Sequence, residues 1–431
     1  MAAAGPTDPE DFFRATRRAV EAVWRIESAR LIAGLARLVR DVGPAEELAQ
    51  DALVVALEQW PRTGIPDDPG PWLMATAKHR AIDLLRRQER YRTKLNLLGR
   101  DAEIQQQSAQ ADLDAALDDH IGDDLLRLMF TAAHPVLSAE AQAALTLRLL
   151  GGLTTGEIAR AFLIPDPTAA QRIVRAKRAL ADAGVQFEMP TPDDMTDRLS
   201  SVLGVIYLIF NEGYSATGGE SWTRPELCQE ALRLGRILAS LLPNEAEVHG
   251  LVALMELHAS RLPARTDAAG QPVLLRDQDR RRWDRLLIRR GLESLDRAES
   301  LGGGPCTLQA EIAACHARSP SAEETDWPRI AALYEVLAYL QPTPVILLNR
   351  AVAVGMADGP DRGLRLVDEL TEERALRNYP QLPAVRGELL TLMGRQDEAR
   401  TEFARAAELT QNQAERILYL KSAAAPNRQP E

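Results

Sequence analysis

A cluster of basic side chains follows Trp72, and together these residues could hold a polyanion. Between Lys78 and Arg100, eight lysine and arginine residues are opposed only by Asp83 and Glu89. Lysine and arginine side chains bind phosphates, and an indole can stack on an exposed base with a gain of about 1–3 kcal/mol. The pattern equally fits a solvated surface helix that has Trp72 in its core. These residues alone leave both interpretations open.

A second basic surface is expected on a helix over 167–183. A short helix that begins near Thr155 and a turn over 163–166 precede it. Its inward positions recur at helical spacing and are Ala169, Ile173, Ala176 and Leu180. Its outward side chains include no acid and are Thr168, Gln171, Arg172, Arg175 and Arg178. A short helix, a tight turn and a basic helix predict a helix-turn-helix, whose exposed residues reach phosphates and base edges.

No pattern in the chain points to catalysis or to a bound metal. The sequence contains no Gly-rich phosphate loop, no G-x-S-x-G and no H-E-x-x-H. The spacing of His249 and His258 does not place both on one helix face, and His316 follows Cys315 at no known zinc spacing. We therefore expect structural or surface roles for these histidines, no enzyme activity, no metal and no cofactor.

The composition limits the partners and the compartment. The 431-residue chain has a formal net charge of −11, so any nucleic-acid site must be a local basic patch on an acidic protein. Three scattered cysteines cannot build a disulfide framework and fit a reducing cytoplasm. No signal peptide is apparent, and the longest apolar run, 202–210, is too short to span a bilayer. We expect a cytoplasmic protein without a membrane segment.

The elements that must position these residues are almost all helices, and we expect an all-α protein. The first domain, over 10–100, should contain two helices before residue 40 and a third helix over 44–60. A turn-rich loop over 61–71 then leads into the basic helix, for which Pro69 suits the first turn. The first domain therefore carries its basic residues at its carboxyl end.

The rest of the chain divides by composition. Residues 101–124 contain eight acidic residues and no lysine or arginine, which predicts an acidic linker. The helix-turn-helix domain is expected over 125–187 and a long helical domain over 198–425. Within the latter we expect a helix over 198–210 followed by a turn at 211–214.

The last part of the long helical domain contains a weak sequence repeat. A charged helix is expected over 278–301. Residues 347–370, with Gly355, resemble 389–409, with Gly394. Small residues where paired helices cross, and a glycine between the helices, are typical of tetratricopeptide-type repeats.

Two small helical domains, the second a helix-turn-helix, resemble a bacterial σ factor of the extracytoplasmic-function (ECF) group. The segment Ala-Glu-Glu-Leu-Ala-Gln-Asp-Ala-Leu at 45–53 resembles the part that docks on the β′ coiled coil of RNA polymerase. Residues 80–87 resemble the helix that reads the −10 element, and 155–159 with 175–180 resemble the −35 helix-turn-helix. The resemblance covers residues 10–185.

This resemblance implies a set of residues for each partner. For polymerase docking the set is Glu46, Glu47, Gln50 and Asp51. For −10 recognition and melting it is Trp60, Trp72, Lys78, His79, Arg80, Asp83, Arg86 and Arg87, with core packing equally open for the two tryptophans. For −35 recognition it is Thr155, Thr168, Gln171, Arg172, Arg175 and Arg178. The implied partners are promoter DNA and core RNA polymerase, through its β′ coiled coil and β flap.

The extension resembles that of an ECF subgroup with a C-terminal tetratricopeptide-like domain. The residues that carry this resemblance are Asn-Glu-Gly-Tyr at 211–214, Gln-Asp-Arg at 278–280, Trp-Asp at 283–284 and Leu-Asn-Arg-Ala-Val-Ala at 348–353. The resemblance implies that the extension regulates the σ factor through an intramolecular or protein partner.

Two departures from the ECF pattern bear on DNA recognition. His79 stands where many ECF proteins carry asparagine, which is expected to alter base preference. Ala169 and Ala170 stand where a branched apolar and a basic residue are common, which is expected to weaken phosphate contacts at −35. The alternative function is a stand-alone DNA-binding regulator with a repeat-type sensor or protein-interaction domain. Association with core polymerase separates the two.

Overall fold

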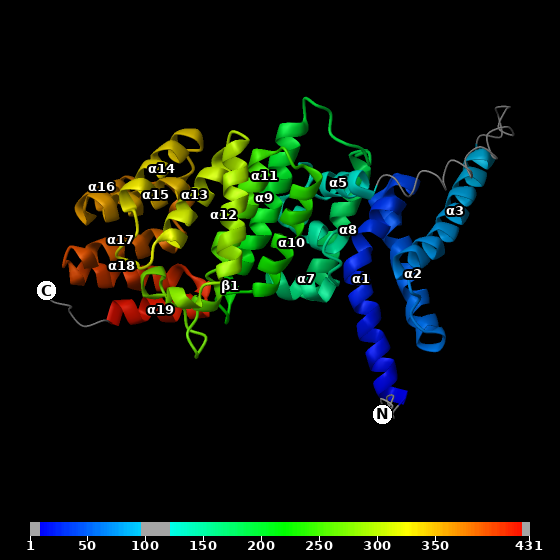
Figure 1. Cartoon of the computed structure of the whole chain (residues 1–431), viewed down its shortest axis with the longest axis horizontal. Helices are drawn as coiled ribbons and strands as arrows, with labels where there is room; N and C mark the ends of the chain where they lie inside the picture. The colour runs from blue at the N-terminus through cyan, green and yellow to red at the C-terminus, as the bar shows by residue number, and fades with distance from the viewer. Residues whose placement is uncertain (1–8, 96–120, 425–431) are drawn as a thin grey trace. The chain divides into compact units, whose positions relative to one another are not determined.

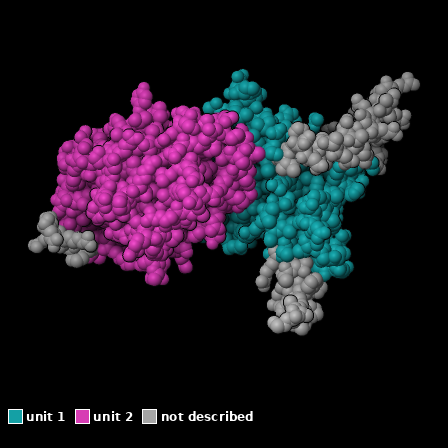
Figure 2. Space-filling view, in the orientation of Figure 1, with its two compact units in different colours: residues 1–205 teal, residues 206–431 magenta. Residues whose placement is uncertain are grey.

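The computed structural model describes residues 9–95 and 121–424, and the chain divides into two compact units. Figure 2 shows residues 1–205 as unit 1 and residues 206–431 as unit 2. Apart from one short two-stranded sheet, the regular structure of the described residues is helical, which confirms the all-α prediction. No described helix is both long and apolar enough to cross a lipid bilayer.

Unit 1 begins with three helices, α1 (Pro9–Val39), α2 (Val42–Thr63) and α3 (Pro69–Leu95) (Figure 1). The prediction of two helices before residue 40 is wrong. α1 is continuous because no proline interrupts it and its apolar stripe runs on through Leu31 and Leu35, which are both buried. α2 begins before Pro44 because the Asp41 side chain accepts a hydrogen bond from Gly43 N and caps the helix.

The connection between α2 and α3 is shorter than predicted. α2 includes Pro61 near its end, so the loop covers 64–68 rather than 61–71. α3 begins at Pro69 as predicted and packs on α1 and α2. Leu73, Ala77 and Ala81, spaced four residues apart, are all buried at this contact. Leu84, the next residue at helical spacing, is half-buried and completes the inward face of the basic helix.

The second group of helices in unit 1 consists of α5 (Ile121–Ala132), α6 (Ala139–Leu149), α7 (Thr155–Phe162) and α8 (Asp166–Asp182). The predicted acidic linker ends earlier than expected, because 121–124 form the first turn of α5. Its residues 101–120 lie outside the described part of the chain.

Local capping fixes where α6 and α7 begin and end. The Ser138 hydroxyl accepts from Ala141 N at the start of α6. Thr154 and Glu157 form a capping box at the start of α7, in which each side chain accepts from the other residue's backbone N–H. Leu163 adopts the left-handed conformation, with φ 51°, and turns the chain from α7 into α8.

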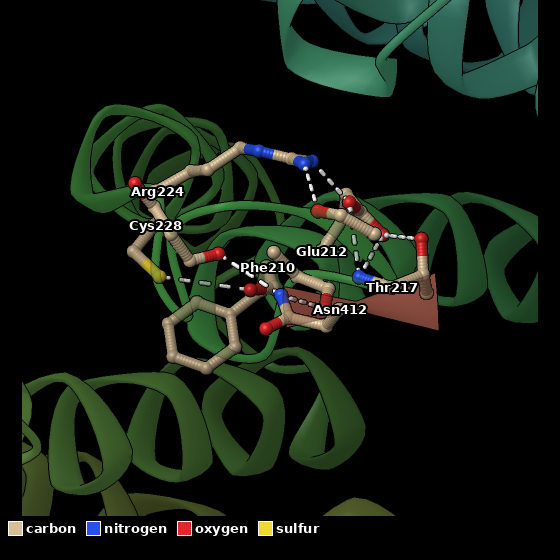
Figure 3. A network of polar contacts seen from close by, with 9 residues as sticks. Phe210, Glu212, Thr217, Arg224, Cys228 and Asn412 are labelled. Carbon is tan, nitrogen blue, oxygen red and sulfur yellow. Dashed lines mark hydrogen bonds and ion pairs between the residues drawn. The ribbon is translucent and has the colours of Figure 1, made fainter. Parts of the chain in front are cut away.

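The helix α9 (Met195–Tyr214) continues through the segment predicted as a turn at 211–214. Its last turn is held by Glu212, which pairs with Arg224 and accepts hydrogen bonds from Thr217 (Figure 3). A side chain at Gly213 would place its Cβ 2.7 Å from Cys228 N, so glycine allows the next helix to approach this turn closely. The turn prediction was wrong because these partners lie later in the chain.

Unit 2 continues as a succession of helices and short 3₁₀ turns, with neighbours in sequence packed on one another (Figure 1). The helices are α10 (Pro225–Leu241), α11 (Ala246–Ala259), α12 (Arg285–Ser300), α13 (Pro305–Arg318), α14 (Trp327–Leu340), α15 (Pro344–Asp358), α16 (Pro360–Glu369), α17 (Gln381–Leu392), α18 (Gln396–Leu409) and α19 (Gln413–Ala424). The 3₁₀ turns are η1 (Leu262–Ala264), η2 (Leu275–Asp277), η3 (Arg280–Arg282) and η4 (Arg374–Leu376).

The helix predicted over 278–301 begins later than expected. Asp284 caps α12 by accepting from Leu286 N and Leu287 N, so this helix starts at Arg285. The preceding residues form η3 instead, which Asp279 caps. Trp283, between the two, is buried in the core of unit 2.

The two glycines assigned to the repeats have different roles. Gly394 lies between α17 and α18 with φ 74°, as predicted. Gly355 lies inside α15, and the glycine that precedes α16 is Gly359, with φ 112°. A Cβ on Gly363 of α16 would lie 2.7 Å from Gly355 Cα, so these two glycines allow α15 and α16 to cross in direct contact.

A short parallel pairing ties the beginning of unit 2 to its end. β1 (Gly218–Gly219) pairs with β2 (Gln411–Asn412). The Asn412 amide, which is 1% exposed, donates to Ala216 O and Ser221 O at 3.0 Å each (Figure 3). The connection between α9 and α10 is therefore bonded to the connection between α18 and α19.

Candidate nucleic-acid interface

The outward face of α3 carries most of the residues predicted for −10 recognition. The exposed side chains are His79, Arg80, Asp83, Arg86 and Arg87, whereas Lys78 is half-buried. Positions 79, 83, 86 and 87 lie on one side of the helix because they are three or four residues apart. Arg80 forms an ion pair of 2.9 Å with Asp51 of α2. The side chains of Arg90, Arg92 and Lys94 lie outside the described ones.

The two tryptophans predicted for strand opening contact each other. Their ring centroids are 5.2 Å apart with an interplanar angle of 63°, an edge-to-face arrangement. Trp60 is only 1% exposed, whereas Trp72 is half-buried. Trp72 is therefore the tryptophan whose indole is partly accessible to a ligand, and the buried Trp60 packs against it.

The helix-turn-helix presents its residues as the spacing predicted. The buried residues of α8 are the four expected ones, Ala169, Ile173, Ala176 and Leu180. Of the outward set, the exposed residues are Thr168, Gln171, Arg175 and Arg178, while Arg172 is half-buried. Thr155, at the start of α7, is also half-buried. Arg178 also lies 3.5 Å from the exposed Asp182, an acid at the end of α8.

The segment predicted to dock on polymerase is divided between two environments. Glu47 and Asp51 are exposed on α2, and Gln50 is half-buried. Glu46 is 1% exposed, and its Oε1 lies 2.5 Å from Arg148 Nε of α6 and accepts from the Gln50 amide. Its other oxygen pairs with Lys177 of α8. The structure thus directs Glu46 toward the helix-turn-helix group rather than toward solvent.

Further contacts hold α1 against the helix-turn-helix group within unit 1. Asp124 of α5 is 3% exposed and lies 3.3 Å from Arg37 and 2.7 Å from Arg127. Arg25 of α1 pairs with Glu157 of α7. Burial would raise the pKa of Glu157, but hydrogen bonds from Thr154 and the charge of Arg25 together lower it.

The close approach of α1 also depends on one glycine. Gly152, in the turn before α7, has φ 64°, a conformation that L side chains rarely adopt. A Cβ at this position would lie 2.7 Å from the Ser28 hydroxyl of α1. Any side chain here would therefore push α1 away from this turn.

The two cations that enclose Glu46, Arg148 and Lys177, were not predicted from the sequence. Arg148 carried no signal because it belongs to a helix that was assigned no function. Lys177 carried a weak one, since it follows the inward Ile173 by four residues and so lies beside the buried face of α8. No group of three or more metal-ligating side chains occurs in the part of the chain that the structure describes.

Three segments of the chain match families of known proteins. Residues 26–91 match the family Sigma-70 region 2, and residues 127–180 match Sigma-70, region 4. Residues 198–299 match a family of unknown function, DUF6596. An uncharacterized protein of Rhizobium meliloti (strain 1021), R00370, is 46% identical over 385 residues, which is 88% of this chain and 89% of that protein.

The two σ-70 regions coincide with the helices that carry the exposed basic faces, α3 in the first and α8 in the second. σ factors with these regions act in transcription initiation by recognising promoters, with core RNA polymerase and promoter DNA as partners. The chain therefore belongs to one family with the Rhizobium meliloti protein, and its σ-70 regions 2 and 4 are those of an ECF-type σ factor.

Proposed function

We propose that this σ factor binds core RNA polymerase and reads the −10 element with α3 and the −35 element with α8. The observation that carries the proposal is the pair of exposed basic faces, one in each σ-70 region. Arg86 and Arg87 are exposed on α3, and Arg175 and Arg178 are exposed on α8. Neither face is needed for the core, because the inward residues of both helices are separate from these positions.

The surface around Trp72 supports a role in strand opening. A base that leaves the stack costs a few kcal/mol, which a stacking partner and an enclosing loop can offset. Trp72 has exposed surface at the start of α3, directly after the loop 64–68. The buried Trp60 packs edge-to-face behind it and fixes its orientation. We assign base contact to Trp72 and support to Trp60.

Polymerase docking through α2 requires a rearrangement in unit 1. Glu47 and Asp51 can reach a partner directly because they are exposed. Glu46 cannot, because Arg148 and Lys177 enclose it. Docking that uses all four predicted residues therefore separates α6 and α8 from α2, and the contacts around Glu46 oppose binding.

We further propose that the tetratricopeptide-like helices of unit 2 regulate the σ regions. Support comes from the consecutive helix pairs α15–α16 and α17–α18. In each pair a glycine with positive φ lies between the two helices. Paired helices of this kind commonly present binding surfaces to other molecules.

Transcription from promoter DNA with bacterial core RNA polymerase and the full chain tests the proposal. The double variant Arg86→Glu/Arg87→Glu should lose specific initiation, because like charges repel the phosphates, while its thermal unfolding stays unchanged. The matched control is Arg285→Glu/Arg289→Glu on α12, which reverses two exposed arginines outside those helix pairs. Preserved promoter opening by the α3 variant contradicts the −10 assignment. DNA binding without any association with polymerase would favour the stand-alone regulator.

A further inference from the structure

A cavity of about 660 Å³ lies entirely among residues of unit 2. Its wall includes Tyr214 at the end of α9, Arg280 in η3, Asn349 on α15 and Tyr419 on α19. The pairing of β1 with β2 brings the first and last of these elements together (Figure 3). A volume of this size falls in the range of about 300–1,000 Å³ that is usual for sites of small organic ligands.

The cavity collects residues from three of the four segments that resemble the extension's signatures. Tyr214 belongs to 211–214, Arg280 to 278–280 and Asn349 to 348–353. Promoter recognition by α3 and α8 uses none of them. Their convergence on one wall needs an explanation other than DNA binding.

Arg280 is a buried cation in this wall. It is 9% exposed, and its Nη1 donates to His316 O and Ser319 O at 2.6 Å each. Its Nη2 donates to the Thr325 hydroxyl at 3.2 Å, and its guanidinium lies 4.9 Å from the ring centroid of Trp283. Neutral carbonyls and hydroxyls position this charge without neutralising it.

Arg265 is a second cation in the wall, held between aromatic rings. Its guanidinium lies 3.8 Å from the ring centroid of Tyr214 and 5.2 Å from that of Trp222. Its Nε is buried and has no hydrogen-bond partner. Burial lowers the pKa of Arg265, which reflects the cost of holding its charge away from water. A side-chain hydrogen bond with Tyr214 offsets part of this cost, while the Nε donor has no acceptor within the described part of the protein.

The acids in the wall do not balance these two cations. Glu388 pairs with a different arginine, Arg276, at 2.8 Å. Glu415 accepts hydrogen bonds from Tyr419 and Gln381 at 2.9 and 3.2 Å. Within the described residues, neither Arg265 nor Arg280 has a carboxylate at ion-pair distance. The charged residues of the wall are Arg265, Arg276, Arg280, Glu388 and Glu415, which leaves an excess of one positive charge. Glu323 and Glu324 act on Arg280 electrostatically without pairing with it.

His316 is influenced by the same positive charges, and one of its ring nitrogens has no hydrogen-bond partner. It is 9% exposed, it lines the cavity, and its Nδ1 is buried without a partner. Burial, with the charges of Arg261 and Arg280, lowers its pKa to about 3. The imidazole is therefore neutral at pH 7 and does not add to the positive charge. The rest of the wall is mainly apolar and includes Trp222, Trp327 and Val352.

We propose that the cavity of unit 2 binds a small organic anion, with its acidic group at Arg265 and its apolar or aromatic body against the tryptophans. Arginine suits this role because its planar fork of donors matches carboxylate and phosphate oxygens. The apolar wall excludes water from the ion pairs, which strengthens them. Carboxylates and phosphate monoesters share this chemistry, and the experiment distinguishes them.

Isothermal titration calorimetry on the full chain tests the proposal with three probes: naphthalene-2-carboxylate, decanoate and phenyl phosphate. Each carboxylate is compared with its neutral amide of the same shape, and phenyl phosphate with phenol. We expect saturable binding of at least one anion at probe concentrations up to about 1 mM, and at least tenfold weaker binding of its neutral counterpart.

Variants connect the binding to the cavity. Arg265→Gln should weaken binding of the anion about tenfold while leaving the neutral probe unaffected. Val352→Trp fills the cavity and should abolish binding without removing a charge. The matched control is Arg281→Gln, the exposed neighbour of Arg280, which should bind as the wild type does.

The outcomes separate the alternatives. Binding of the neutral probes as tightly as the anions would identify an apolar cavity only and overturn the proposal. No saturable binding by any probe, or equal anion binding by wild type and Arg265→Gln, also overturns it. Because the titration contains neither polymerase nor DNA, its failure leaves the proposed promoter function untouched.

Discussion

Glu46 on α2 and Arg148 on α6 form a buried ion pair, with 2.5 Å between Glu46 Oε1 and Arg148 Nε. Lys177 on α8 approaches the other carboxylate oxygen. Glu46 is 1% exposed, and removal of one partner from a buried ion pair is strongly destabilising. The same carboxylate lies in the segment that we propose for docking, so α6 and α8 compete with polymerase for it.

Removal of one competing cation should favour polymerase. Lys177→Gln weakens the contact between α2 and α8, and we expect roughly fivefold tighter binding of core polymerase, about 1 kcal/mol. Fluorescence anisotropy without DNA measures this affinity. Arg160→Gln is the matched control, since it removes one exposed positive charge from the neighbouring helix α7. Unchanged or weaker binding by Lys177→Gln would show that the contact does not oppose docking.

Asp51→Arg should weaken polymerase binding at least tenfold without unfolding the chain. The Asp51–Arg80 pair that it breaks is about half exposed, with side-chain exposures of 58% and 43%, and such pairs contribute only about 0–1 kcal/mol to stability. A pull-down with core polymerase measures the effect. Arg80→Ala breaks the same pair from the other side, so loss of binding in both variants would assign the effect to the pair rather than to docking.

The contact between α1 and α7 should respond to acid. Because the pKa of Glu157 is lowered below its ordinary value of 4.5 in the folded chain, its carboxylate contributes stability that is complete above about pH 4.5. This contribution is lost as the pH falls through the folded-state pKa. The difference in the free energy of unfolding between wild type and Glu157→Gln should shrink below that pH in urea titrations. Arg25→Gln should reduce the same difference, whereas a difference independent of pH would rule the linkage out.

Asn412→Ala should destabilise unit 2 by about 1–3 kcal/mol, because it leaves the buried Ala216 carbonyl and the part-buried Ser221 carbonyl without their donor. Amide hydrogen exchange should then accelerate in the connection between α9 and α10. The neighbouring Gln411→Ala is the control, since that side chain is exposed. Equal protection in the two variants would mean that the asparagine does not hold this connection.

Features that depend on helical spacing could be predicted from the sequence. Ala169, Ile173, Ala176 and Leu180 are all buried, as their intervals required. Pro69 stands in the first turn of α3, as expected. Such features depend on residues within a few turns of one another, so local patterns in the sequence are sufficient to predict them.

Features that depend on distant partners could not be predicted. Glu46 lies among acidic residues that are typical of a solvated helix face. Its burial depends on Arg148, which is 102 residues away in the sequence. Gly355 was assigned to a turn because its contact with Gly363 across two helices is invisible in the spacing. The cavity of unit 2 combines segments that are separated by most of the length of that unit. The sequence therefore contained no indication that Arg265 and Arg280 lie in the wall of one cavity.

The bond between β1 and β2 changes how unit 2 should respond to damage. An open helical array can lose its last repeat while the others persist, because each repeat contacts only its neighbours. Here the last helix, α19, follows a strand that is fastened to residues 218–219. Proteolysis between α18 and α19 would therefore free both the connection after α9 and the last helix, α19. The two sides of the cavity wall that these segments form would be lost in one cooperative step.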